Sequence, residues 1–282
     1  MRNGYLVLAL CASLVSAAEV NVEIVFDQEQ FLRSESLPLR LRIRNFSGQT
    51  LKLGTSSDWL TFTVQGRDGV SMVRTGEMPP TQPFSLESSK TASLSADLMP
   101  YFKLSEPGHY SVTARVRIPE IEKELTTAPR TFDIVSGTKL WEREFGVPGT
   151  QPPIVRKFAL QQATFLKQLR LYVRLTDPNE SRVFRVLPIG ALLSFSTPEA
   201  ALDQSSHLHV IFQNGAQSFL YSVVAPDGEQ IIRQTWDQTN TRPRLLAESD
   251  GRVVVRGGAR RILLSDLPPP LVANTNDMVR SK

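Results

Sequence analysis

The sequence is poor in the residues on which covalent and redox chemistry depends. It contains a single cysteine, Cys11, and three histidines among 282 residues. Because a disulfide joins two thiols, the chain forms no internal disulfide and must fold on its hydrophobic core alone. The hydrophobic fraction of 41% is sufficient for such a core and excludes a wholly disordered chain. A catalytic thiol is excluded from the mature chain, because Cys11 lies in the apolar leader described below.

The common catalytic motifs are also missing. The sequence has no Gly-x-Ser-x-Gly elbow, no Gly-x-Gly-x-x-Gly fingerprint and no phosphate-binding loop. Glycoside hydrolysis needs paired carboxylates, and Glu199 and Asp203 are the candidate pair in this sequence. Their spacing is equally typical of a solvated surface, which is the interpretation we adopt. We therefore expect no enzymatic activity and no cofactor.

Two of the histidines, His207 and His209, are two positions apart on a predicted strand and so share a face. Asp203 is the nearest carboxylate, but a zinc site needs a third ligand at suitable spacing, and none is evident. His109 belongs to a different part of the chain. We predict no metal site and interpret the pair as polar residues on a solvated strand face.

The N-terminus has the pattern of a secretory signal peptide, which we assign to residues 1–18. Arg2 provides the positive charge, Tyr5 to Val15 form a short apolar run, and Ser16 to Ala18 are small residues suited to cleavage. The run is too short to span a bilayer. Lipidation at Cys11 is disfavoured because Leu10 precedes it where a small residue is required. These features, with the missing disulfides, favour a bacterial protein exported to the periplasm or the extracellular space, without a transmembrane segment after cleavage.

The formal net charge is +4, with basic residues scattered along the predicted strands. Arg40, Arg42 and Arg44 alternate with apolar residues and form a stripe on one face of a strand. We interpret the stripe as a solvated sheet face; the alternative is a patch for an anionic polysaccharide or lipid head group. Export disfavours a nucleic-acid partner.

The first module, residues 19–136, reads as seven or eight short strands separated by turns. Its clearest strand lies within LSEPGHYSVTARVRI (104–118), where Tyr110 and every second residue after it are apolar or small and share one face. The spacing of Leu104, Gly108 and Tyr110 is that of a tyrosine corner, in which the tyrosine hydroxyl bonds to upstream backbone.

Three stretches of this module, LRLRIRNFSGQTLKL (39–53), FTVQGRDG (62–69) and LSEPGHYSVTARV (104–116), resemble bacterial immunoglobulin-like accessory domains. The resemblance extends loosely to the sandwich family of intracellular proteinase inhibitors. It implies an immunoglobulin-like β-sandwich, with roles ranging from adhesion to inhibition. Inhibitors present an exposed loop, for which the Pro-rich stretch from Glu77 to Phe84 is the one long candidate.

A junction, residues 137–156, leads to a second β-rich module, residues 157–266, and a disordered tail, residues 267–282. Apolar residues in 157–170 fall at roughly helical spacing and predict a helix, with a strand as the alternative. The segments LYVRLTDPNESRVFRV and LYSVVAPDGEQIIRQT begin at Leu171 and Leu220 and both predict a hairpin. They weakly resemble β-propeller blades, but the module has room for only two, so we expect an open antiparallel sheet or a second sandwich.

The fold class expected overall is all-β. The best candidate for a binding residue is Trp236 at a strand end, with Asp237 and Asn240 beside it as a rim where a sugar could stack. We predict a non-catalytic binding or assembly protein of the bacterial cell envelope. Its expected partner is an envelope protein or a polysaccharide, and the second module is the candidate surface for oligomer formation. The alternatives are an envelope glycoside-acting enzyme with its site in the second module, and a protease inhibitor.

Overall fold

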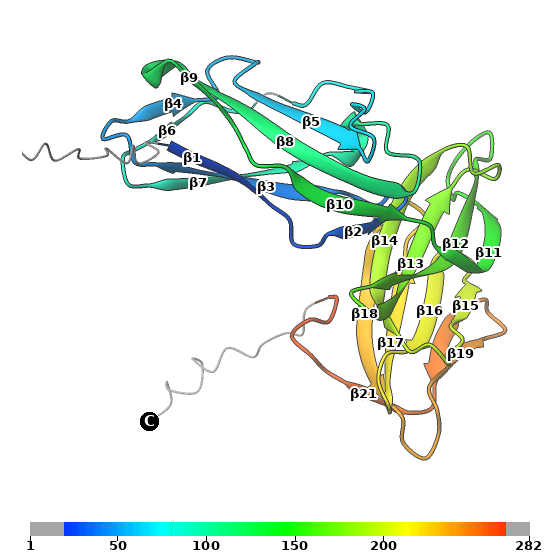
Figure 1. Cartoon of the computed structure of the whole chain (residues 1–282). Coiled ribbons are helices and arrows are strands. Elements are labelled where there is room, and N and C mark those ends of the chain that lie inside the picture. Colours follow the sequence, from blue (N-terminus) through cyan, green and yellow to red (C-terminus); the bar gives the residue numbers. More distant parts are fainter. Residues whose placement is uncertain (1–19, 80, 269–282) are drawn as a thin grey trace, which may run out of the picture. The chain divides into compact units, whose positions relative to one another are not determined.

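The structure, a computed structural model, describes residues 20–79 and 81–268 and is nearly all β, with several antiparallel sheets (Figure 1). This confirms the predicted fold class. The predicted signal peptide and residues 269–282 of the predicted tail lie outside the described residues. No helix in the described part of the chain is long and apolar enough to cross a membrane.

The described chain divides into two compact units, and each contains more than one segment of the sequence. The first contains residues 20–27, 38–101 and 111–131. The second contains residues 28–37, 102–110 and 132–268.

One sheet of the first unit has the order β1 (Val20–Val25), β3 (Pro38–Asn45), β7 (Thr91–Asp97), and its strands are antiparallel. Leu39, Leu41 and Ile43 of β3 are buried, as their alternation predicts. The arginines between them form ion pairs with acidic side chains: Arg40 with Asp27, and Arg42 and Arg44 with Glu23. Three arginines thus face two carboxylates, because Arg42 and Arg44 share Glu23, and the charge of the stripe is only partly neutralised.

The remaining strands of this half of the chain are short, apart from β8. β8 (Gly108–Ile118) pairs with β9 (Lys123–Thr126) and with β5 (Leu60–Gly66), and β10 (Arg130–Val135) runs parallel to β2 (Gln30–Leu32). β4 (Leu51–Leu53) pairs with β6 (Phe84–Leu86), and the 3-10 turns are η1 (Met99–Tyr101) and η2 (Pro119–Ile121). The Tyr110 hydroxyl donates a hydrogen bond to the Glu106 carbonyl at 2.7 Å, which confirms the hydrogen bond predicted for a tyrosine corner.

The second unit contains two successive antiparallel meanders. The first has the order β11 (Thr138–Gly146), β12 (Val155–Phe165), β13 (Gln168–Thr176), β14 (Val183–Leu192). The second has the order β15 (Glu199–Leu202), β16 (Leu208–Gln213), β17 (Ser218–Val224), β18 (Gln230–Asp237), β21 (Ala259–Arg261). β19 (Arg244–Ala247) and β20 (Val253–Arg256) form a separate hairpin. Leu171 and Leu220 thus lie on the third strand of each meander, and both predicted hairpins are confirmed.

The predicted helix in 157–170 is wrong, because these residues form most of β12 and the start of β13. Phe158, Ala159 and Leu160 are all buried, so both faces of β12 are covered and apolar residues occur at positions that imitate a helix. Leu166 and Lys167 both have positive φ, as in a two-residue hairpin turn. Neither residue is the glycine or asparagine that usually marks such a turn.

The core of the second unit is built from residues of both meanders. One buried cluster contains Phe158 and Val173 of the first meander, whose strands form the first sheet of this unit, and Phe212 of the second meander, which forms the second sheet. The outer face of each sheet is covered as well. Leu32 packs with Tyr172 on the outer side of the first sheet, and the β19–β20 hairpin packs against the outer side of the second. Several strands of this unit are therefore apolar on both faces.

Candidate functional site

The three residues predicted to bind a ligand lie at the end of β18 and in the loop after it. Trp236 is half-buried and packs against the cluster on the outer face of the second sheet, and its indole N–H is buried without a hydrogen-bond partner among the described residues. Asp237 pairs with Arg261 at 3.3 Å, and Asn240 is exposed. Their role in binding stays a prediction.

A polar hollow of about 320 Å³ lies elsewhere in the second unit, lined by residues of the β12–β13 turn, β14 and β18. Its apolar walls include Leu169, Pro188 and Ile189. Gly190, with φ of +148°, lines it too, and a Cβ there would stand 2.9 Å from Leu220 Cδ2. The absent side chain therefore lets β14 approach the second sheet closely.

The polar lining of this hollow is basic and neutral. Arg170, Arg233, Gln168 and Gln230 contribute to it, and none of its lining residues is acidic. The Arg170 guanidinium lies 4.0 Å from the centre of the Phe165 ring. An anion or a hydroxyl-rich ligand suits this lining better than a cation does.

A second cluster of functional groups surrounds His209, which is buried at 7% exposure. Its Nδ1 lies 2.7 Å from the Tyr221 hydroxyl, and its Nε2 lies 3.2 Å from Asp203 Oδ2. His207 Nδ1 lies 3.0 Å from the same carboxylate oxygen. The two histidines thus share a face, but the predicted solvated surface is wrong for His209, because the β19–β20 hairpin covers the face that also carries Tyr221.

Asp203 is held in place by the backbone as well as by the histidines. Its Oδ1 accepts hydrogen bonds from the N–H groups of Ser205 at 2.9 Å and His207 at 2.8 Å, which closes the turn between β15 and β16. Burial alone would raise the pKa of Asp203, but the hydrogen bonds from the His207 N–H and from the two imidazoles outweigh it and lower the pKa. Burial raises the pKa of Tyr221 to about 12. This cluster is internally satisfied, as a structural network requires.

The His209 environment predicts a pH-dependent stability. Burial lowers the pKa of His209 below that of an unfolded histidine, against the opposing effect of Asp203. The unfolded chain therefore binds the proton more readily, so this contribution is present above about pH 6.5 and is lost as the pH falls through the folded pKa. The free energy of unfolding, measured in urea, should fall between about pH 7 and 5. His209→Gln should flatten this dependence, whereas His207→Gln should retain it; an unchanged slope in His209→Gln would contradict the assignment.

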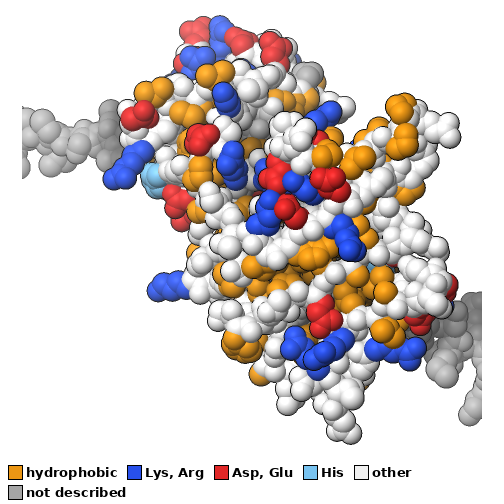
Figure 2. Space-filling model, turned by 90° about the vertical axis from the view of Figure 1, so that its right-hand side faces the viewer, with side chains coloured by type: hydrophobic (Ala, Val, Ile, Leu, Met, Phe, Trp, Pro, Cys, Tyr) orange, Lys and Arg blue, Asp and Glu red, His pale blue; other side chains and the backbone are white. Residues whose placement is uncertain are grey.

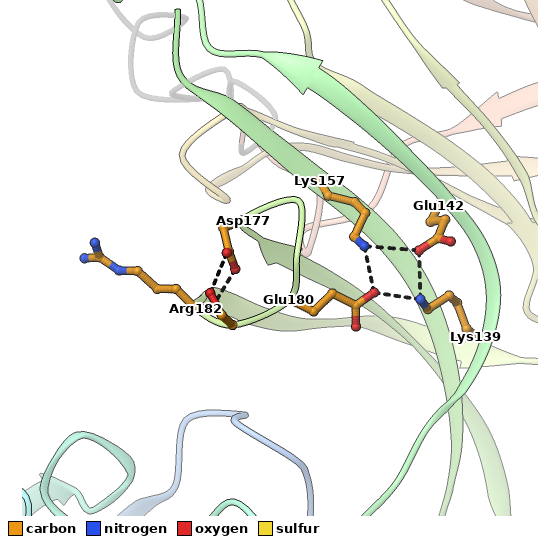
Figure 3. Close-up of polar contacts among 7 residues, drawn as sticks. Lys139, Glu142, Lys157, Asp177, Glu180 and Arg182 are labelled. Carbon is orange, nitrogen blue, oxygen red and sulfur yellow. Dashed lines mark hydrogen bonds and ion pairs between the residues drawn. The ribbon is translucent and has the colours of Figure 1, made fainter.

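A third group of charges joins β11, β12 and the β13–β14 hairpin (Figure 3). Lys139 Nζ contacts Glu142 at 2.8 Å and Glu180 at 2.7 Å, and Lys157 Nζ contacts Glu180 at 2.8 Å. Hydrogen bonds from Lys139 and Lys157 lower the pKa of Glu180 to about 2. Both carboxylates are therefore ionised and paired, which suits a structural role rather than proton transfer.

Acidic side chains elsewhere in the second unit are engaged in a similar way. Asp177 accepts from the Arg182 N–H at 2.6 Å in the same hairpin (Figure 3), and Glu199 accepts from the Leu245 N–H at 2.9 Å. The candidate pair for glycoside hydrolysis is therefore engaged in two different hydrogen-bond networks, Glu199 with the Leu245 N–H and Asp203 with its own turn and the two histidines. On the face drawn in Figure 2, acidic and basic side chains are interspersed. Among the described residues, no group of three or more His, Cys, Asp or Glu side chains is arranged to hold a metal ion.

The comparisons with known proteins assign no family. No family model matches the chain, and no curated protein matches it. Among solved structures, the chain is similar to the sporulation control protein Spo0M from Bacillus subtilis, with 8% identity and a TM-score of 0.30. The similarity covers 56% of this chain and 80% of that one. A similarity of this size identifies neither a family nor a function.

Proposed function

We propose that the chain is an exported, non-catalytic binding or assembly protein of the bacterial cell envelope, with an immunoglobulin-like sandwich in its N-terminal part. The observation that carries the proposal is the polar hollow of the second unit, which is lined by arginine, glutamine and apolar side chains and by no carboxylate. Such a lining offers hydrogen bonds and charge to a ligand without a general acid or base. The signal-like N-terminus supports the location.

The alternative of a glycoside-acting enzyme requires two carboxyl groups that flank a bound sugar, about 5 to 9.5 Å apart. The hollow supplies none, and Glu142, Glu180, Asp177 and Asp203 are each engaged by lysine, histidine or backbone partners. These contacts favour binding over hydrolysis. Protease inhibition is a separate alternative, which a panel of proteases would test.

Sedimentation with envelope fractions tests the proposal. The protein is produced from residues 1–282, so that any leader is processed in the cell, and is then mixed with washed envelope fragments. We expect labelled, folded protein to sediment with the fragments in a saturable manner. An excess of unlabelled protein should displace it. Matched samples without fragments control for aggregation. A protein that stays in the supernatant at all fragment concentrations would contradict the proposal.

A further inference from the structure

Among the described residues, Arg233 is the cation in the polar hollow that lacks a counter-ion. In the strand register, Arg233 of β18 lies opposite Ser222 of β17. Because residues opposite each other on neighbouring strands point to the same face, Arg233 lies on the face opposite Tyr221 and Val223. That is the side of the second sheet turned toward the first. Within the described residues, the Arg233 side chain has no ion pair and no hydrogen bond, while its backbone bonds to Leu267. A half-buried guanidinium without an anion is an incomplete ion pair.

The second arginine of the hollow is already engaged. Arg170 lies over the Phe165 ring, and its Nη1 is 3.4 Å from Gln28 Oε1. It also interacts electrostatically with the buried carboxyl group of Glu35. Arg170 therefore adds positive potential to the hollow, whereas Arg233 is the group available for direct contact with an anion.

The groups around Arg233 are those that recognise a sugar ring. Gln230 donates through Nε2 to the Ser222 hydroxyl at 2.9 Å, which leaves its amide oxygen as an acceptor for ligand hydroxyls. Gln168 also lines the hollow, is exposed, and offers both a donor and an acceptor. Leu169 and Pro188 provide apolar surface for the C–H face of a ring.

Building on the proposed function, we propose that this hollow binds an acidic saccharide, a sugar residue that carries a carboxylate. The planar guanidinium of Arg233 matches a carboxylate with two parallel hydrogen bonds. The glutamine amides bind the hydroxyl groups, and the apolar wall contacts the ring. A volume of about 320 Å³ is at the small end of ligand pockets and admits one or two sugar rings.

Calorimetric titration with oligogalacturonate tests this site, with the neutral galactose oligomer of equal length and inorganic phosphate as comparisons. Wild type should bind oligogalacturonate at least tenfold more tightly than either comparison. Arg233→Gln should weaken that binding at least tenfold, and Arg244→Gln, at an exposed position of β19, should leave it unchanged. Circular dichroism establishes that both variants are folded.

Equal binding of acidic and neutral oligomers, equal binding of phosphate, or an unaltered affinity in Arg233→Gln would overturn the acidic-saccharide site. The sedimentation test separates this failure from that of the proposed function. If wild type and Arg233→Gln sediment equally with envelope fragments, the binding function stands and the site is wrong. If neither sediments and neither binds oligogalacturonate, both proposals fail.

Discussion

Phe158→Ala should destabilise the second unit by about 3 to 5 kcal/mol, as truncation of a buried phenylalanine does in other cores. Phe158 is 0% exposed, and its ring stacks on Phe145 with the centroids 4.6 Å apart. It belongs to the cluster between the two meanders, so its loss leaves a cavity between both sheets. Urea unfolding followed by fluorescence measures the change.

Phe195→Ala is the matched control, because the same side chain is 77% exposed there. It should change the free energy of unfolding by no more than about 0.5 kcal/mol. Comparable losses in the two variants would contradict the assignment of Phe158 to a shared core.

Asp203→Ala should destabilise the protein by about 2 to 4 kcal/mol, because it leaves several donors without an acceptor. The carboxylate accepts from two backbone N–H groups of its own turn and from the imidazoles of His207 and His209. Because the His209 imidazole is buried, water cannot replace the lost acceptor, and most of the loss in the free energy of unfolding arises there. The difference in the free energy of unfolding, measured in urea at pH 7, gives the cost.

Asp250→Ala is the control for this second prediction. Asp250 also closes a turn, accepting from the Arg252 N–H at 3.1 Å, but its surroundings are exposed. Its removal should cost about 1 kcal/mol or less, because water replaces the lost partner. Equal costs at the two positions would show that the Asp203 network contributes nothing beyond its turn.

The sequence predicted those features that depend on neighbouring residues. Alternation along β3 placed Leu39, Leu41 and Ile43 in the core. The spacing of Leu104 and Tyr110 predicted the hydroxyl-to-backbone bond that is observed. Proline, aspartate and glycine marked the turns that connect β13 with β14 and β17 with β18. Each of these features is determined by residues that lie within one strand, one hairpin or one turn of the chain.

Features that depend on distant segments were missed. The Leu166-Lys167 turn contains no glycine or asparagine, so the sequence predicts a helix where the structure has β12. The sequence predicts a solvated face for His209, because no residue near it indicates that the β19–β20 hairpin covers that face. The hollow combines the β12–β13 turn, β14 and β18, which only the packing of the two sheets brings together. For β12, the apolar residues at successive positions are the sequence signal that indicates a strand covered on both faces.

We propose that this protein binds an envelope component without altering it. Mass spectrometry of the polymer eluted from the sedimented complex distinguishes binding from degradation. We expect bound and untreated polymer to have the same masses after prolonged incubation. Shortened fragments that accumulate with time would contradict it and identify the protein as an enzyme.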